Sequence, residues 1–431
     1  MNEIFMIEQF YDLSPELLQA DQKTLELCTE PFARLEKIKE YNQLKMLRAF
    51  TDCGVGAHHL VGTTGYGYDD AGRIKLEEVF AKVVGAEASL FRYNFMSGTH
   101  TLTVALFGVL RPGDTMVAAT GRPYDTLLGV IGLEGEGYGS LKEWGVHYDE
   151  VPLLANSQPD LAGIEEKCKN AKMCYIQRSR GYAARGALSL DQIEAISRAA
   201  KRANPEIIVM VDNCYGEFTQ MQEPTQRGAD LMAGSLIKNP GGGIAPTGGY
   251  IAGRKDLVES CAHRLSAPGT GGEIGCTLDV LRELYLGLYY APGVVCDALK
   301  TSVYASCLFE VLGYQATPGY KEDRNDIITS VETHSPEGMI ALCGGVQAGS
   351  PVDSYAAPLP GDMPGYEDQV IMAAGAFTMG SSIELSADGP VRPPYTVYMQ
   401  GGINFHASRA GVMLGADRML KLGKTGEKQE R

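Results

Sequence analysis

The chain has 431 residues, 44% of them hydrophobic and 21% charged, which is typical of a globular protein rather than a disordered one. The formal net charge of −15 argues against nucleic acid or an anionic membrane as a main partner, because both require a basic surface. No apolar stretch has the length of a membrane span and the first residues lack a basic secretory segment, so we expect a cytoplasmic protein with no membrane partner.

Ten cysteines are scattered along the chain without a Cys-x-x-Cys pair or the Cys/His spacing of a metal site. We therefore expect reduced thiols in the core and no metal centre. The length exceeds that of one ordinary hydrophobic core, which predicts two or three domains.

The first fifty residues predict helices outside the main sheet. Ser14-Pro15-Glu16 is a helix start, and the segment to about Phe50 is rich in Leu, Glu, Lys and Gln. A glycine-rich loop is expected over 54–72, and 74–84 has helical periodicity.

From residue 100 to residue 252, predicted helices alternate with predicted strands. This order indicates the α/β fold class, with a mainly parallel sheet covered by helices on both faces. The expected helices are 100–110, 126–133 and 190–203, and the expected strands are 115–120, 146–152, 173–177, 207–211, 231–237 and 249–252.

The rest of the chain predicts a smaller α/β domain. It would be reached through a helical stretch, 278–312, that is interrupted at Pro292-Gly293. Strands are expected at 327–331, 382–385 and 396–399, helices at 337–343 and 407–422, and a frayed polar tail over 423–431. The predicted domains are an N-terminal helical segment (1–53), a large domain (54–275), and connector helices with a C-terminal small domain (276–431).

Two neighbouring predicted strands end in residues that suit one cofactor. Asp212 ends the apolar run that begins at Ile207, and Lys238 ends the run that begins at Leu231, with Ser235 three residues before the lysine. Pyridoxal 5'-phosphate needs a lysine that holds its aldehyde as a Schiff base, and a carboxylate that keeps its ring nitrogen protonated. Singly, Lys238 could be a surface lysine and Asp212 a turn cap, but together they predict a cofactor site at strand ends, where α/β sheets bind ligands.

Further residues are candidates for holding the phosphate and the ring of this cofactor. Ser97, Gly98 and Thr99 precede an apolar helix whose first N–H groups would face an anion, and Ser235 is a second phosphate candidate. An ordinary helix cap would have the same sequence. Tyr124 follows a predicted strand and could stack on the ring, or be a half-buried tyrosine at a helix start.

Arginines on two loops are candidates for binding a substrate carboxylate. Arg392 lies in a loop stiffened by Pro390, Pro393 and Pro394, and a fixed guanidinium can bind a carboxylate through two parallel hydrogen bonds. A surface arginine on a proline-rich loop is the alternative. Arg178 and Arg180, after the strand 173–177, are rival candidates for binding a carboxylate or a phosphate.

Five segments resemble one family. They are 65–70 (GYGYDD), 97–100 (SGTH), 211–218 (VDNCYGEF), 234–242 (GSLIKNPGG) and 392–395 (RPPY). They resemble the bacterial proteins described as methionine γ-lyase-like or aluminium resistance proteins, which are fold-type I pyridoxal-phosphate enzymes related to the cystathionine lyases. The resemblance extends from about Phe32 to Leu422.

The resemblance implies a large cofactor domain, a smaller C-terminal domain, and a homodimer or homotetramer. It also implies that the loop carrying Tyr66 and Tyr68 reaches a neighbouring subunit's active site and contacts the substrate there. Two departures from the γ-lyase pattern leave contacts open. No arginine stands between Tyr66 and Asp70, and residues 179–182 (SRGY) replace a Ser-x-Asn-Pro.

The resulting hypothesis is a carbon–sulfur lyase that acts on a sulfur-containing amino acid by β- or γ-elimination and yields a thiol, a 2-keto acid and ammonia. Lys238 would remove the α-proton, and Tyr124 would stack on the ring and protonate the leaving sulfur. Arg392 or Arg180 would bind the substrate carboxylate. The substrate itself stays open, and a transferase or aminotransferase of the same cofactor class is an alternative.

Two other interpretations belong to different classes of protein. Ser235 and Lys238 also match the Ser-x-x-Lys of penicillin-binding acyl-enzymes, with a Lys-Thr-Gly at 424–426, although that triplet falls in a charged tail and no Ser-x-Asn separates the two motifs. A non-catalytic metal-tolerance protein is a remote alternative, because Asp69-Asp70 alone is a poor site for a hard cation.

Overall fold

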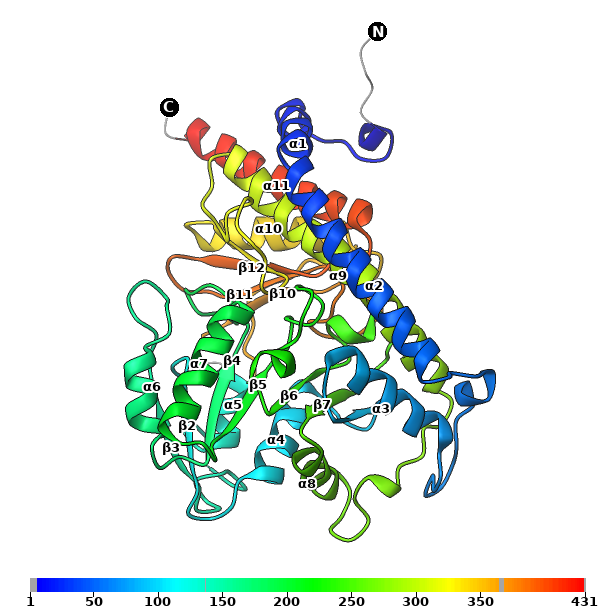
Figure 1. The fold of residues 1–431 in the computed structure, drawn as a ribbon. Coiled ribbons are helices and arrows are strands. Elements are labelled where there is room, and N and C mark those ends of the chain that lie inside the picture. Colours follow the sequence, from blue (N-terminus) through cyan, green and yellow to red (C-terminus); the bar gives the residue numbers. More distant parts are fainter. Residues whose placement is uncertain (1–5, 136, 364–367, 430–431) are drawn as a thin grey trace. The chain divides into compact units, whose positions relative to one another are not determined.

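A computed structural model describes residues 6–135, 137–363 and 368–429 of the protein (Figure 1). The chain forms two compact units: a large unit of residues 40–292, and a small unit made of residues 1–39 together with 293–431. The boundaries fall inside two long helices, α2 (Thr29–Asp52) and α9 (Leu281–Val311), which each pass from one unit into the other. The limits expected from the sequence, 53/54 and 275/276, lie just outside these helices.

The large unit contains a seven-stranded sheet in the order β1-β7-β6-β5-β4-β2-β3. The strands from β6 to β3 run parallel, and β7 is antiparallel to both of its neighbours. The mainly parallel α/β sheet predicted from the alternation of elements is therefore confirmed. The strands are β1 (Ala88–Arg92), β2 (Thr115–Ala118), β3 (His147–Glu150), β4 (Met173–Gln177), β5 (Ile208–Asp212), β6 (Leu231–Ser235) and β7 (Gly249–Gly253).

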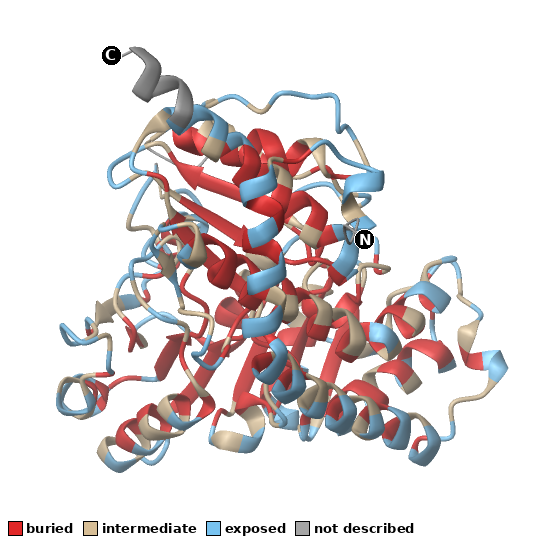
Figure 2. Cartoon of the chain, turned by 90° about the horizontal axis from the view of Figure 1, so that it is seen from above, coloured by how far each residue is buried: buried red, intermediate tan, exposed pale blue. Residues whose placement is uncertain are grey.

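Helices cover both faces of this sheet. One core holds alternate strand residues, such as Met173 and Met210, together with apolar residues of α4, α5 and α8. Strand residues of the other parity, such as Cys174 and Val209, are equally buried, so the opposite face is also covered, and α7 packs on β4 there. Figure 2 shows the strands coloured as buried. The helices are α3 (Ala71–Val84), α4 (Gly98–Val109), α5 (Asp125–Ile131), α6 (Leu161–Cys168), α7 (Leu190–Ala203) and α8 (Lys255–Leu265), with short 3-10 turns η2 (Ala57–Leu60), η3 (Pro224–Arg227), η4 (Asn239–Gly241) and η5 (Gly271–Glu273).

The small unit is built on an antiparallel five-stranded sheet in the order β10-β11-β12-β9-β8. Helices α10 and α11 pack closely on each other, because Gly345 lies against Gly415 and Gly349 against Gly411. The elements are η1 (Met6–Gln9), α1 (Pro15–Leu27), β8 (Ala316–Thr317), β9 (Ile328–Glu332), α10 (Pro336–Ala348), β10 (Val370–Ala373), β11 (Ser386–Pro390), β12 (Thr396–Gln400) and α11 (Phe405–Gln429).

Three sequence-based expectations about this part of the chain are wrong. Helix α9 runs through Pro292 without the predicted interruption, since buried side chains on both sides of the proline, Leu288 and Val295, hold the two halves in place. The strand expected at 382–385 is a loop, because the Glu384 carboxylate accepts the N–H groups of Phe377 and Thr378, and β11 begins at Ser386. Helix α11 continues to Gln429 instead of ending at 422.

The Lys-Thr-Gly at 424–426 lies within α11 rather than on a strand, so the acyl-enzyme interpretation is wrong. All ten cysteines are free thiols; eight are buried, and Cys214 and Cys276 are half-buried. No helix in the described part of the chain is both long enough and apolar enough to cross a membrane. Within the same residues, no group of three or more His, Cys, Asp or Glu side chains is placed to hold a metal ion.

Candidate active site

Three neighbouring parallel strands of the large unit end at the same edge of the sheet in a polar residue. Strand β4 ends in Gln177, β5 in Asp212 and β6 in Ser235, and the register places Gln177 beside Asp212. In each of these strands, the residue two positions earlier belongs to the core that is covered by α4, α5 and α8. All three therefore point to the face on which α4 lies.

Lys238 lies three residues beyond β6, where the η4 turn begins, and it is half-buried. Its Nζ donates a 2.5 Å hydrogen bond to the hydroxyl of Tyr215. The same nitrogen lies 4.4 Å from the centroid of the Tyr215 ring, which is a cation–π contact. The predicted lysine is thus held beside an aromatic residue that the sequence analysis did not single out.

Asp212 is a buried carboxylate without an ionic partner. Its Oδ1 accepts the N–H of Cys214 at 3.1 Å, and its Oδ2 accepts the Tyr175 hydroxyl at 3.3 Å. No lysine, arginine or histidine of the described residues forms an ion pair with it. Burial raises the pKa of Asp212 above its ordinary value, and the Cys214 hydrogen bond only partly opposes this effect. A cationic group placed next to Asp212 would offset the free-energy cost of burying its charged carboxylate.

The start of α4 lies against the ends of β5 and β6. A Cβ atom at Gly98 would be 3.4 Å from Cβ of Ser235 and 3.7 Å from Sγ of Cys214. Ser97 caps the helix by accepting the N–H of His100 at 3.0 Å, and the Thr99 hydroxyl is 2.8 Å from that of Thr126 on α5. The first N–H groups of α4, beginning with Gly98 and Thr99, thus open beside Ser235, in an arrangement suited to an anion.

Tyr124 is linked to the strand ends through Gln177. Its N–H donates to Gln177 Oε1 at 2.7 Å, and its ring lies against Gly181, where a Cβ atom would be 2.8 Å from Tyr124 Cδ2. Gly181 has a φ of +54°, so this close approach depends on glycine. Arg180 is buried in the same loop, and its Nε donates to the carbonyl of Ala183 at 3.3 Å.

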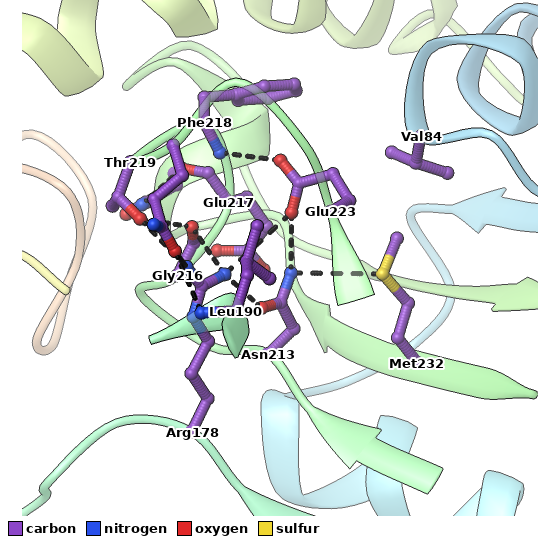
Figure 3. A network of polar contacts seen from close by, with 12 residues as sticks. Val84, Arg178, Leu190, Asn213, Gly216, Glu217, Phe218, Thr219, Glu223 and Met232 are labelled. Atoms are coloured by element: carbon purple, nitrogen blue, oxygen red, sulfur yellow. Dashed lines mark hydrogen bonds and ion pairs between the residues drawn. The ribbon is translucent and has the colours of Figure 1, made fainter. Parts of the chain in front are cut away.

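A polar network lies behind the strand ends (Figure 3). Arg178 and Asn213 each follow a strand-end residue by one position, so they point away from the α4 face. Arg178 is fully buried, and its Nη1 donates to Asn213 Oδ1 at 2.8 Å and to the carbonyl of Gly216 at 2.9 Å. Its Nη2 donates to Thr219 and Gln220. Arg178 is therefore an interior structural residue and not the substrate-binding arginine considered above.

Two buried acids complete this network. Glu223 accepts the N–H of Phe218 at 2.9 Å and the side-chain amide of Asn213 at 3.2 Å (Figure 3). Glu217 accepts the hydroxyl of Tyr250 at 2.6 Å. Burial raises the pKa of both acids, that of Glu217 to about 8. Glu217 lies in the segment 211–218 that carries the family resemblance, but no role was predicted for either acid, and the partner of Glu217, Tyr250, lies on a different strand.

The loop with Tyr66 and Tyr68 leaves both rings exposed, at 72% and 62%, with centroids 5.5 Å apart. The loop is anchored at its end by Asp70, which accepts the Thr277 hydroxyl at 2.6 Å, the N–H of Arg73 at 2.8 Å and the Thr63 hydroxyl. The two exposed tyrosines are thus presented from a fixed base.

Arg392 belongs to the small unit, in the segment between β11 and β12. Its Nη1 forms an exposed ion pair with Asp368 at 2.9 Å. Its role toward a substrate stays a prediction.

A sequence profile of the methionine gamma-lyase family matches residues 17–420. The chain belongs to this family.

Solved structures and curated relatives agree with this membership. A carbon–sulfur lyase involved in aluminium resistance from Clostridium novyi NT is 45% identical, covers 96% of this chain and 98% of its own, and superposes with a TM-score of 0.92. The protein YnbB of Bacillus subtilis (strain 168) is 45% identical over 390 residues, 90% of this chain and 93% of the relative. The pyridoxal-5'-phosphate dependent protein YhfS of Escherichia coli, 16% identical, covers 88% of this chain and 95% of its own with a TM-score of 0.59, and shares the fold alone.

The fold is accordingly that of the fold-type I enzymes, as the resemblance implied. In this chain, Asp212, Ser235 and Lys238 lie at or just beyond the ends of adjacent strands, and the start of α4 lies beside them. The structure also places Tyr215, Arg178 and the two buried acids around this edge.

Proposed function

We propose that the protein is a pyridoxal-phosphate-dependent carbon–sulfur lyase that acts on a sulfur-containing amino acid by β- or γ-elimination. The observation that carries the proposal is the placement of Asp212 and Lys238 at the carboxyl ends of the adjacent strands β5 and β6. Family membership and the lyase of Clostridium novyi support it.

The donor set fits the cofactor. Asp212 is buried, forms no ion pair within the described part of the chain, and would pair with a protonated ring nitrogen. Ser235 and the N–H groups of Gly98 and Thr99, with Ser97 as the helix cap, would hold the phosphate. Lys238 would form the covalent link. The bound cofactor would supply an electron sink for the charge that develops on the substrate α-carbon.

In the proposed reaction, Lys238 accepts the α-proton at Nζ, since it is the only amine at these strand ends among the described residues. Tyr124, held through Gln177, stacks on the cofactor ring and protonates the leaving sulfur. Arg392 or Arg180 binds the substrate carboxylate, and Tyr66 and Tyr68 contact the substrate. With the uptake of one water molecule, the products are a thiol, a 2-keto acid and ammonia.

The decisive experiment is to reduce the purified protein with borohydride and to map the modified peptide. We expect a pyridoxyl group on Lys238, and loss of keto-acid production in Lys238→Ala. Lys167→Ala, which changes a surface lysine paired with Asp149, is the matched control and should keep full activity. Modification of a different lysine, or full turnover by Lys238→Ala, would refute the proposal.

A panel of sulfur amino acids then separates the remaining alternatives. Release of both thiol and ammonia with a 2-keto acid supports elimination. Transfer of the amino group to an added keto acid, without thiol release, supports an aminotransferase instead. A protein that binds the cofactor but converts no amino acid would support the non-catalytic interpretation.

We further propose that the protein works as a homodimer or homotetramer in the cytoplasm. The exposed pair Tyr66 and Tyr68, on a loop anchored through Asp70, supports a contact with a second copy. The absence of disulfides among the ten cysteines is consistent with a reducing compartment. Sedimentation of the wild-type protein and of a Tyr66→Ser/Tyr68→Ser variant tests the assembly; an unchanged oligomer in the variant would contradict the role of this loop.

A further inference from the structure

We propose that Tyr215 is a positioning residue for Lys238, which holds the lysine amine at one place above the strand ends and sets the pH at which the amine becomes reactive. This inference rests on the proposed function only in taking Lys238 as the reactive amine. It concerns a residue of the turn after β5 that has no assigned role.

The contact between the two side chains is of two kinds. Nζ of Lys238 donates to the Tyr215 hydroxyl at 2.5 Å, and it also lies 4.4 Å from the ring centroid. Both interactions are stronger with an ammonium than with a neutral amine, because the hydroxyl accepts a charge-assisted hydrogen bond and the ring face is negative. Tyr215 therefore favours the protonated form of Lys238 and restricts the rotamers of a long, flexible side chain.

The backbone of Tyr215 shows that the surrounding structure determines its position. Its φ is +69°, in the left-handed region that bulky residues rarely occupy. Such a conformation is strained for a bulky residue and persists only where neighbouring contacts enforce it, which is commonly the case at functional sites.

The enforcing contacts lie on both sides of Tyr215. Before it, the N–H of Cys214 is bound to Asp212 at 3.1 Å. After it, the Gly216 N–H donates to the carbonyl of Asn213 at 2.8 Å, and the Gly216 carbonyl accepts from Arg178 at 2.9 Å (Figure 3). A Cβ atom at Gly216 would come within 2.5 Å of Arg178 Nη1, so only glycine permits this approach.

The turn that carries Tyr215 is also hydrogen-bonded to the residue that follows Lys238. Asn239, directly after Lys238, donates its side-chain amide to the carbonyl of Glu217 at 2.8 Å. The backbones that carry Tyr215 and Lys238 are therefore linked independently of the contact between their side chains. The buried network of Figure 3 thus positions the tyrosine, and the tyrosine positions the lysine.

The other titratable groups near this pair do not take over the role of Tyr215 in favouring the protonated form of Lys238. Burial, together with the nearby Asp212 carboxylate, raises the pKa of the Cys214 thiol well above its ordinary range, so this thiol stays neutral. Asp212 accepts from Cys214 and Tyr175, and Arg185 acts on it from a distance. These groups are unchanged when only the Tyr215 hydroxyl is removed.

The test uses Lys238 itself in the cofactor-free protein. The rate at which an amine-reactive reagent modifies Lys238 is measured by peptide mass spectrometry across the pH range from 6 to 10. In Tyr215→Phe, which keeps the ring, we expect modification at neutral pH to be about three- to tenfold faster, with the pH midpoint shifted downward. Tyr215→Leu, which also removes the ring, should shift it further.

Tyr148→Phe is the matched control, because this half-buried tyrosine lies on the edge strand β3, where its hydroxyl contacts Glu150. In Tyr148→Phe, the pH dependence of the Lys238 modification rate should equal that of the wild type. If Tyr215→Phe fails to fold, Asn239→Ala, which loosens the same link while leaving Tyr215 in place, should shift the profile in the same direction.

Borohydride mapping of each variant with the cofactor added distinguishes a failure of the role of Tyr215 from a failure of the proposed function. An unchanged Lys238 profile in Tyr215→Phe, with the cofactor still attached to Lys238, would overturn the role of Tyr215 and leave the proposed function standing. Attachment of the cofactor to another lysine in the wild type would overturn the proposed function, and the role of Tyr215 with it.

Discussion

Glu217 and Tyr250 form a 2.6 Å hydrogen bond in a place where neither side chain touches solvent. The second carboxyl oxygen of Glu217 has no hydrogen-bond partner among the residues that the structure describes. Burial, with a smaller contribution from the neighbouring Glu223, raises the pKa of Glu217 to about 8, although the hydrogen bond from Tyr250 and the charge of Arg178 oppose the shift. At neutral pH the folded protein therefore keeps this acid protonated directly behind the Tyr215 turn.

This protonation makes stability depend on pH with a definite sign. The unfolded chain loses the Glu217 proton near pH 4.5, whereas the folded protein holds it to about pH 8. Between these values the folded state binds more protons, so this group lowers the free energy of unfolding as pH rises, by about 1.4 kcal/mol per pH unit, and the decline ends above pH 8.

Glu217→Gln should remove this contribution. We expect the free energy of unfolding of the variant, relative to wild type, to rise between pH 5 and pH 8, measured by urea denaturation at each pH. Glu165→Gln, which changes an exposed acid paired with Arg202, should show a constant difference. Parallel pH curves for Glu217→Gln and wild type would contradict the buried, protonated state.

Arg178 should be the most sensitive charged residue of the network. Replacing it with methionine preserves most of its length but leaves Asn213, the Gly216 carbonyl and Glu223 without their cationic partner. We expect a loss of about 3–5 kcal/mol in the free energy of unfolding, measured in urea. In Arg198→Met, which removes an exposed ion pair with Glu194 on α7, the change should stay within about 0.5 kcal/mol. Similar losses in both variants would show that the buried network stabilises the folded protein no more than an exposed ion pair does.

The elements that position the site are those with the plainest sequence patterns. Strands β4 to β6 are short apolar runs, and the polar residues at or just beyond their ends indicated Asp212 and Lys238, because a parallel sheet brings the ends of its strands together. The start of α4 was also found, since a Ser-Gly before an apolar helix is a local signal.

The residues that support the site could not be found in this way. Tyr215 lies in a left-handed turn that the distant Arg178 contacts at the Gly216 carbonyl, and Glu217 finds its partner, Tyr250, on another strand. Similarly, Pro292 looked like a helix end because the packing that offsets it is not local. Local patterns predict elements and their ends, whereas contacts between distant segments decide which buried polar groups are tolerated.

The electrostatic role of Asp212 gives the next prediction. Asp212→Asn keeps the shape of the side chain and an acceptor oxygen, but it removes the charge that would pair with the cofactor ring. We expect weaker cofactor binding and an elimination rate lower by about 10²- to 10³-fold, measured by equilibrium dialysis and by keto-acid release. Asp230→Asn, at the opposite end of β6 beside Lys201, is the control and should retain both. Wild-type affinity and rate in Asp212→Asn would exclude this carboxylate from the site.

The anchor of the Tyr66–Tyr68 loop is testable through Thr277. Asp70 is fully buried; burial would raise its pKa, but hydrogen bonds from Thr277, Thr63 and the Arg73 N–H hold it below its ordinary value. A lowered pKa stabilises the folded protein above about pH 3.8, and this stabilisation disappears as pH falls through the folded-state pKa.

Thr277→Val removes one of these donors without changing the shape of the side chain. We expect a loss of about 1–3 kcal/mol at pH 7 that shrinks below pH 4, together with faster proteolytic cleavage in the loop 61–69. In Thr301→Val the lost hydroxyl donates to the backbone carbonyl of Asp297 in its own helix, which does not titrate, so any change in stability should be independent of pH. A Thr277→Val effect that is equally large at pH 3 and pH 7 would mean that Asp70 is not the group the hydroxyl stabilises.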